Sequence, residues 1–193
     1  MRLSGRFFEV FMNNLMIDLE TMGNTHNTAI IAIGACFFDP KTGAIGGKFY
    51  KEVNLESAVA FGTEMDASTV LWWLKQSDEA RSKFKENSKA ASLHDVLSEF
   101  YDFCKLAKNL KPWGNGITFD LGILANSFEK CNIKTPWMFW NERDVRTVVE
   151  LGQMVGFDPK KDMPFTGTPH YALDDAIHQA KYVSAIIQKV TAS

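Results

Sequence analysis

Short apolar runs separated by turn-forming residues dominate the first quarter of the chain. Residues 15–19, 29–38 and 48–53 are rich in Ile, Phe and Val, which favour strands. A Gly-Asn pair at 23–24 separates the first two runs, and Asp-Pro-Lys-Thr-Gly at 39–43 separates the second two. The pattern predicts a three-stranded antiparallel meander.

The remaining chain is dominated by apolar positions at helical spacing. Ser92 and Asp95 form a capping-box pattern ahead of one such stretch. Short strands are expected near Trp113 and at residues 138–140. The predicted helices span residues 67–76, 92–107, 119–130, a stretch beginning at 145, and 172–190. A meander followed by alternating strands and helices predicts an α/β fold with a mixed sheet, antiparallel in the meander and parallel beyond it, flanked by helices.

The length and composition are those of one compact domain. The chain has 193 residues, of which 46% are hydrophobic and 12% aromatic, so it can bury a full core. No repeat or Pro/Ser-rich linker divides it. We expect residues 13–193 to form a single domain and residues 1–12 to be a disordered extension outside it.

The three cysteines and the absence of long apolar runs indicate where in the cell the protein is found. Cys36, Cys104 and Cys131 form no CxxC pair, which favours buried thiols in a reducing compartment. No apolar run approaches the roughly 18 residues needed to cross a bilayer, and the N-terminal residues lack the pattern of a signal peptide. These features predict a cytoplasmic protein without a membrane partner.

The charge balance gives no electrostatic indication of a nucleic-acid partner. The formal net charge is −2 and the pI about 6.1, so the sequence lacks the basic footprint of a tight nucleic-acid binder. A site that holds divalent cations brings its own positive potential, however. The objection to a nucleic-acid substrate is therefore weak.

Asp18 and Glu20 close the first predicted strand. Residues i and i+2 of a strand face the same side, so the two carboxylates project together. A divalent cation between them would relieve their repulsion, and Mg²⁺ is commonly held by one or two carboxylates. Alternatively, both are ordinary polar residues at a strand end.

Two later segments carry further candidate residues. Asp120 follows a glycine-rich turn and lies in the first turn of a predicted helix, either as a metal ligand or as compensation for the helix dipole. His170 precedes the last predicted helix, and Asp174 and Asp175 lie inside it. A histidine there can be a base or a structural residue. Helical geometry does not choose between the two aspartates, and His178 offers Asp174 a hydrogen bond.

Together, these motifs resemble the DEDDh branch of the RNase T / DNA polymerase III proofreading-subunit exonuclease superfamily, which has a ribonuclease H-like fold. The likeness covers roughly residues 13–190. Residues 68–73, 76–81 and 139–147 look like segments of phage-encoded exonucleases of the T-even exonuclease A type. The family's spacing of five residues between histidine and acid selects Asp175 over Asp174.

The resemblance implies a 3′-5′ exonuclease that releases nucleoside 5′-monophosphates with two Mg²⁺ or Mn²⁺ ions. His170 would be the general base, because its ordinary pKa suits proton transfer at neutral pH. The substrate would be a nucleic-acid 3′ end, single-stranded, with DNA favoured over RNA by the phage likeness. A homodimer is compatible with the family. The implied metal ligands are Asp18, Glu20, Asp120 and Asp175.

Substrate contacts are expected at four positions. Met22 and Gly23 follow the first carboxylate pair, where the resemblance places the terminal nucleotide; a simple turn is the alternative. Trp72 offers a stacking face to a base, although one of the adjacent pair Trp72 and Trp73 should lie in the core. Asn115 either assists the turn before Asp120 or forms an Asx-type backbone bond.

Some alternatives stay open at this point. Arg143 and Arg146 either meet phosphate or pair with Asp144 and Glu142. An exoribonuclease, a phosphohydrolase acting on small nucleotides and an inactive nucleic-acid-binding module on the same fold are the rival functions. Assays on labelled DNA and RNA strands separate them.

Overall fold

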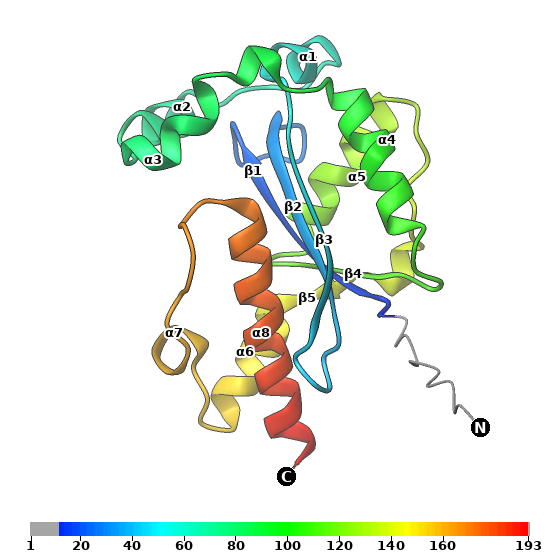
Figure 1. The fold of residues 1–193 in the computed structure, drawn as a ribbon, viewed down its shortest axis with the longest axis vertical. Coiled ribbons are helices and arrows are strands. Elements are labelled where there is room, and N and C mark those ends of the chain that lie inside the picture. The colour runs from blue at the N-terminus through cyan, green and yellow to red at the C-terminus, as the bar shows by residue number, and fades with distance from the viewer. Residues whose placement is uncertain (1–11, 193) are drawn as a thin grey trace, which may run out of the picture.

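A computed structural model describes residues 12–192, and a five-stranded mixed sheet forms its centre (Figure 1). The strand order is β3-β2-β1-β4-β5. The first three strands pair antiparallel, whereas β1 with β4 and β4 with β5 pair parallel. This confirms the predicted α/β fold with a meander and parallel strands. The strands are β1 Asn14–Thr21, β2 Ile30–Phe38, β3 Ile45–Glu52, β4 Lys111–Gly114 and β5 Arg143–Asp144.

The five predicted helices are present, and three short helices were not predicted. The N-cap half of the predicted capping box is present, since Ser92 Oγ accepts from the backbone N–H of Asp95, while the hydroxyl donates to the Asp95 carboxylate. The unpredicted helices α1, α3 and α7 have only four to six residues, too few to show a helical period. The helices are α1 Leu55–Ala60, α2 Ala67–Leu74, α3 Asp78–Arg81, α4 Leu93–Cys104, α5 Asp120–Lys130, α6 Val145–Met154, α7 Pro159–Asp162 and α8 Ala172–Thr191, with 3₁₀ turns at Ser82–Phe84, Asn87–Lys89 and Phe139–Asn141.

The predicted strand at residues 138–140 is wrong. Its aromatic residues favour a strand, but Phe139 and Trp140 are exposed in a 3₁₀ turn. The fifth strand lies a few residues later, where Arg143 pairs with Trp113. A strand requires a partner for its backbone groups, and β4 is within reach only there.

Helices cover both faces of the sheet, and β1 contributes to both layers. Leu15, Ile17 and Leu19 pack with residues of α4 and α5. Met16, on the opposite face, packs with residues of α6 and α8. Asp18 and Glu20 share the parity of Met16, so the alternation of the strand directs them towards α8. The three cysteines are free and buried, as predicted.

The described part of the chain runs from Met12 to Ala192. Residues 1–11 lie outside the described residues, so the expected disorder of the extension stays a prediction. Met12 is described and packs against the core cluster beneath α4 and α5. None of the helices within residues 12–192 combines the length and apolar character needed to cross a bilayer.

Gly34 on β2 allows the start of α8 to approach the sheet. It pairs with Asp18 in the β1–β2 ladder, and a Cβ atom at this position would lie 2.1 Å from the backbone carbon of Ala172. Only a residue without a side chain fits. The contact places the first turns of α8, which carry Asp175, directly over the strand that carries Asp18.

We predict that Gly34→Ala lowers the free energy of unfolding by about 3 kcal/mol or more, because two backbone segments must separate to admit one methyl group. Urea unfolding measures the loss. Gly122→Ala is the matched control: no atom lies within 4 Å of its Cβ position on α5, and the exchange should stabilise the helix by about 0.5–1 kcal/mol. Equal stability of Gly34→Ala and the wild type would contradict the packing argument.

Candidate active site

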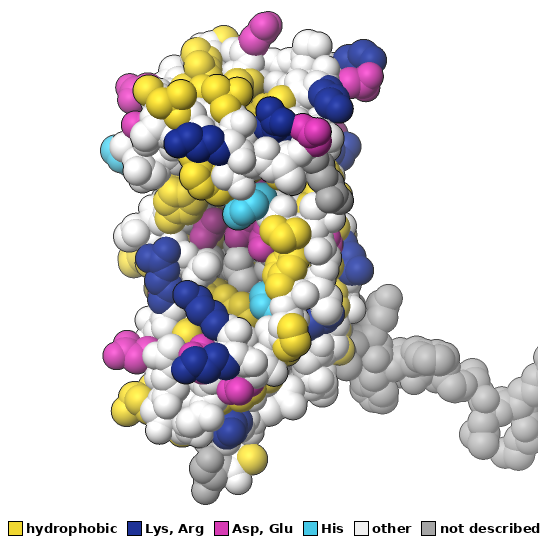
Figure 2. Space-filling model, turned by 90° about the vertical axis from the view of Figure 1, so that its left-hand side faces the viewer, with side chains coloured by type: hydrophobic (Ala, Val, Ile, Leu, Met, Phe, Trp, Pro, Cys, Tyr) yellow, Lys and Arg dark blue, Asp and Glu magenta, His cyan; other side chains and the backbone are white. Residues whose placement is uncertain are grey.

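Three carboxylates converge at the end of β1 beside the first turns of α8. Ligand oxygens of Asp18, Glu20 and Asp175 all lie within 4.8 Å of one another. Glu20 is buried and the other two are half-buried. The register of β1 against β2 shifts directly after Glu20, where the strand leaves the regular ladder. Figure 2 shows acidic side chains at the bottom of a hollow in this face of the molecule.

Asp175, and not Asp174, belongs to this cluster. The carboxylate of Asp174 accepts a hydrogen bond from the backbone N–H of Thr168 at 2.9 Å. This bond connects the loop before α8 to the first turn of the helix. That bond takes the role that we considered for His178, whose ring packs edge-on against Phe165. The two aspartates therefore point to different surroundings, as successive residues of a helix do.

Asp120 lies at the start of α5, buried beside the three other acids. Its carboxylate accepts hydrogen bonds from the backbone N–H groups of Asn115 and Leu19. The pairing of β1 with β4 ends at Met16, so Asp120 satisfies an N–H that the ladder no longer uses. Gly114 permits the approach, because a Cβ atom there would lie 3.0 Å from the Cβ of Asp120.

The crowding of acids changes their proton affinity. Burial, followed by repulsion from Asp120, Glu20 and Asp175, raises the pKa of Asp18 well above its usual range. Burial raises the pKa of Asp120 to about 7, against the hydrogen bonds from the backbone. Clustered carboxylates of this kind are stabilised by cations, and hard oxygen ligands suit Mg²⁺ or Mn²⁺. The donor set therefore fits divalent cations.

Gln179 is a site residue that the sequence motifs did not indicate. Its Nε2 donates a 2.7 Å hydrogen bond to Oδ1 of Asp18. The side chain is buried, and its Oε1 has no hydrogen-bond partner among the described residues. Gln179 follows Asp175 by four residues on α8, so the same helical face presents both. The four-residue spacing from Asp175 is the feature of the sequence that could have indicated Gln179.

His170 lies in the turn before α8, five residues ahead of Asp175. Its φ is 62°, a left-handed conformation that is uncommon for residues other than glycine. Its ring meets Trp72 edge-on, with the centroids 5.0 Å apart, and lies 6.3 Å from Trp73. The strained turn thus holds the imidazole against two aromatic rings.

The two tryptophans divide their roles as expected. Trp73 is buried, and its Nε1 donates to the carbonyl of Thr21 at 3.0 Å. Trp72 is 42% exposed and leaves one part of its ring open to solvent. Trp73 is therefore a core residue, and Trp72 is a partly exposed residue in contact with His170.

Met22 and Gly23 form the tight turn after the carboxylate pair. The N–H of Met22 donates to the carbonyl of Ala29, and its carbonyl accepts from the N–H of Asp66. Gly23 has no room for a side chain, since a Cβ atom would lie 2.6 Å from Oγ1 of Thr28. Because the N–H of Met22 is engaged, its side chain is the part available for contact.

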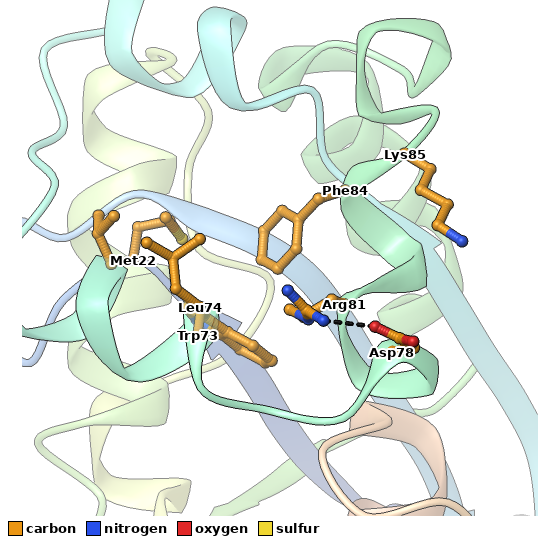
Figure 3. Close-up of a pocket in the computed structure, with 8 residues that line it drawn as sticks. Met22, Trp73, Leu74, Asp78, Arg81, Phe84 and Lys85 are labelled. Carbon is orange, nitrogen blue, oxygen red and sulfur yellow. Dashed lines mark hydrogen bonds and ion pairs between the residues drawn. The ribbon is translucent and has the colours of Figure 1, made fainter.

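The side chain of Met22 lines an apolar pocket of about 470 Å³ with residues of α2 (Figure 3). Trp73, Leu74 and Phe84 form much of its wall. Arg81 and Asp78 form an ion pair at its edge. A flat apolar group of the size of a nucleobase matches this lining.

A second, more polar groove of about 740 Å³ lies between α6 and α8 and reaches the carboxylates. Asn115, one of the predicted substrate contacts, lines it. Asp175 and Gln179 form its inner wall, and Arg146 lies opposite. Arg143 donates instead to the backbone oxygens of Trp140 and Glu142.

Comparison with known proteins identifies the family. Residues 13–187 match the family model described as the 3′-5′ exoribonuclease Rv2179c-like domain. The exodeoxyribonuclease of Enterobacteria phage T4 is 29% identical in an alignment that covers 86% of this chain and 84% of that protein.

Solved structures support the fold. The nuclease domain of 3′hExo, a DEDDh family member bound to rAMP, superposes with a TM-score of 0.59 at 18% identity, covering 93% of this chain and 94% of that one. Exonuclease I gives a TM-score of 0.63 at 14% identity, covering 93% of this chain and 40% of that one. At such identities the likeness shows the ribonuclease H-like fold alone. The family match settles the assignment: the chain belongs to the 3′-5′ exoribonuclease Rv2179c-like domain family and is a 3′-5′ exonuclease.

Proposed function

We propose that this exonuclease removes nucleotides from the 3′ ends of single-stranded DNA, with two Mg²⁺ or Mn²⁺ ions, and releases nucleoside 5′-monophosphates. The observation that carries the proposal is the carboxylate cluster, in which oxygens of Asp18, Glu20 and Asp175 lie within 4.8 Å of one another. Asp120 lies close enough to add to the repulsion on Asp18, and His170 precedes the helix that carries Asp175. Bound cations would polarise the phosphodiester and offset the charge that develops on its oxygens.

The acids would act as metal ligands, and each would be held in position by a different contact. Asp18 is central, because repulsion from all three other acids acts on it. The hydrogen bond from Gln179 holds its carboxylate in one orientation. Asp120 is anchored by backbone N–H groups, and Asp175 by the rigid helix. Pre-organised ligands keep the substrate phosphate in line for attack.

His170 would take the proton from the attacking water. An imidazole titrates near neutral pH, which suits a general base, and the edge contact with Trp72 limits the orientations of its ring.

We predict that His170→Asn lowers kcat by about 10²–10⁴-fold, the usual contribution of a positioned base, and leaves Mn²⁺ affinity unchanged. Asparagine tolerates the left-handed φ of this position better than alanine does, so the exchange removes the base without adding backbone strain. Single-turnover kinetics and calorimetric Mn²⁺ titration measure the two quantities. A variant with full activity would exclude His170 as the base.

The choice of DNA rests on one comparison and is opposed by another. The phage T4 relative is named an exodeoxyribonuclease, whereas the family model is described as an exoribonuclease. We favour DNA because the phage relative aligns over most of both chains. Discrimination against RNA requires a contact that senses the 2′-hydroxyl.

Degradation of matched DNA and RNA oligonucleotides, each labelled at the 5′ or the 3′ end, tests polarity and sugar together. With Mn²⁺, we expect a ladder of shortened 5′-labelled DNA and immediate release of the 3′ label as a mononucleotide. Faster loss of RNA would reverse the choice of substrate. Intact strands of both kinds would refute the proposed activity.

The terminal nucleotide would lie against Met22, Gly23 and Trp72. The apolar pocket beside Met22 matches a base, and the exposed part of the Trp72 ring offers a stacking surface. Trp72→Ala should raise KM for oligonucleotides more than it lowers kcat, because it removes a binding surface and leaves the carboxylates in place.

A further inference from the structure

The groove between α6 and α8, which contains Asp175, differs in chemistry from the pocket beside α2, which contains Met22 from the turn after Glu20. The pocket is apolar and suits a base, whereas the groove is lined largely by polar and charged side chains. Lys and Arg side chains border the lower part of the hollow in Figure 2, on the side of α6 and α7. A nucleic-acid strand has the same division between apolar bases and an anionic backbone.

Arg146 is the cation best placed in this groove. It lies in the first turn of α6, is exposed, and makes no ion pair with any residue in the described range 12–192. The carboxylate of Asp144 caps α6 through the N–H of Thr147 and accepts from Ile117. Arg146 forms no ion pair with it, although, against the opposing effect of burial, hydrogen bonds and then the charge of Arg146 lower the pKa of Asp144. The guanidinium therefore retains its donors for a ligand.

A glycine holds the guanidinium in position. Gly116 has φ 110°, and a Cβ atom there would lie 3.1 Å from Cζ of Arg146 and 3.3 Å from both of its terminal nitrogens. The flat group thus rests against bare backbone. Burial raises the pKa of Asp120, and the nearby positive charge of Arg146 opposes that rise. Arg146 consequently lies on the groove wall that faces the cluster.

The groove also carries three carboxylates, and the exposed Glu150, one helical turn after Arg146, is the one that an anion would have to avoid. Asp158 is engaged in capping α7, where it accepts from the N–H of Lys160 at 3.1 Å, and its other oxygen lies 3.4 Å from Lys161. Lys160 itself lines the groove. Asp175 belongs to the cluster whose charge bound cations would offset.

We propose that this groove binds the strand that remains after cleavage, and that Arg146 contacts a backbone phosphate of that strand. The inference rests on the proposed function, since it assumes a 3′ end at the carboxylates. A guanidinium recognises phosphate with two parallel hydrogen bonds and carries no sequence preference when it does so. The terminal base would then occupy the α2 side, and the retained backbone the α6 side.

A substrate without a retained strand separates this role from catalysis. In the p-nitrophenyl ester of thymidine 5′-monophosphate, nitrophenol replaces the retained strand as the leaving group. We expect Arg146→Ala to raise KM for a ten-residue oligothymidylate about tenfold, as the loss of one charged hydrogen-bonded contact does, and to change hydrolysis of the ester less than twofold. The KM of Arg146→Lys should lie between those of the wild type and Arg146→Ala, because lysine keeps the charge and loses the paired donors of the guanidinium.

Dinucleotide substrates test whether Arg146 contacts the phosphate on the first retained residue. A dinucleotide with a 5′-phosphate carries one phosphate on the retained residue, and the unphosphorylated form carries none. The wild type should prefer the phosphorylated form, and Arg146→Ala should lose most of that preference. The dependence of oligothymidylate binding on salt should also become shallower by about one unit in a log-log plot.

Lys134→Ala is the control for general loss of positive charge, since Lys134 is exposed and lines a different pocket beside α5. An equal loss on the ester and the oligonucleotide, or an equal effect of Lys134→Ala, would overturn the proposal. Failure of the wild type to hydrolyse either substrate would instead refute the proposed function, so the two failures are distinguishable.

Discussion

Asp18→Asn should abolish exonuclease activity and at the same time raise the melting temperature of the metal-free protein. Asparagine has the size of aspartate and can still accept the hydrogen bond from Gln179. It cannot supply the negative charge that a divalent cation requires. We expect kcat to fall by on the order of 10³-fold or more, in line with the loss of a major electrostatic contribution.

The gain in stability has the same origin as the loss of activity. In the metal-free protein Asp18 is repelled by Asp120, Glu20 and Asp175, and its pKa is raised. A neutral residue relieves this repulsion. An increase of about 3 °C is expected, which corresponds to about 1 kcal/mol for a domain of this size. Stability given up for a functional charge cluster is restored when the charge is removed.

Differential scanning calorimetry in EDTA and an oligonucleotide assay with Mn²⁺ measure the two effects. Asp102→Asn is the control, because Asp102 is an exposed aspartate on α4. It should change neither quantity. If Asp18→Asn retained activity or melted earlier than the wild type, the carboxylate cluster would not have the role that we propose.

The second large effect is a change in the pH dependence of stability when divalent cations bind. The pKa of Asp120 is raised to about 7 from an ordinary value of 3.8, and that of Asp18 is raised as well. The folded state therefore binds more protons than the unfolded state between these values. It follows that the metal-free protein loses stability as the pH rises from about 4 through about 7.

Cations compete with these protons, so Mn²⁺ should stabilise the protein more at pH 8 than at pH 5.5. At a hundredfold excess over Kd, binding contributes about 2.7 kcal/mol, or about 5–11 °C in melting temperature. Thermal melts at both pH values, with Mn²⁺ and with EDTA, give the comparison. Asp120→Asn should flatten the metal-free profile. A metal-free protein that is more stable at pH 8 than at pH 5.5 would contradict the shifted pKa values.

Local pattern predicted much of the fold because its main elements are long and regular. The meander of apolar runs and the amphipathic helices α4 and α8 carry a period that sequence alone reveals. The elements that escaped are short. The fifth strand has two residues, and its position depends on where β4 offers a free edge, which no local preference encodes.

The candidate site, like the fold, has some features that the sequence predicts and others that depend on tertiary packing. The strand period alone determined that Asp18 and Glu20 share a face, and the order of the motifs indicated the family. The resemblance selected Asp175 over Asp174, and the structure gives the physical reason, because Asp174 accepts from the N–H of Thr168 in the loop before α8. Gln179 likewise reaches Asp18 across 161 residues of sequence, because Gly34 lets α8 approach the sheet.

From the sequence by itself follow the class of fold, the family and the acidic residues that it requires. Only the tertiary structure decided that three of these acids share one small volume, that Gln179 fixes Asp18, and that Arg146 faces a polar groove beside them. The physical reason is that residue type and periodicity are properties of a segment, whereas distance between segments arises from the packing of helices on a sheet.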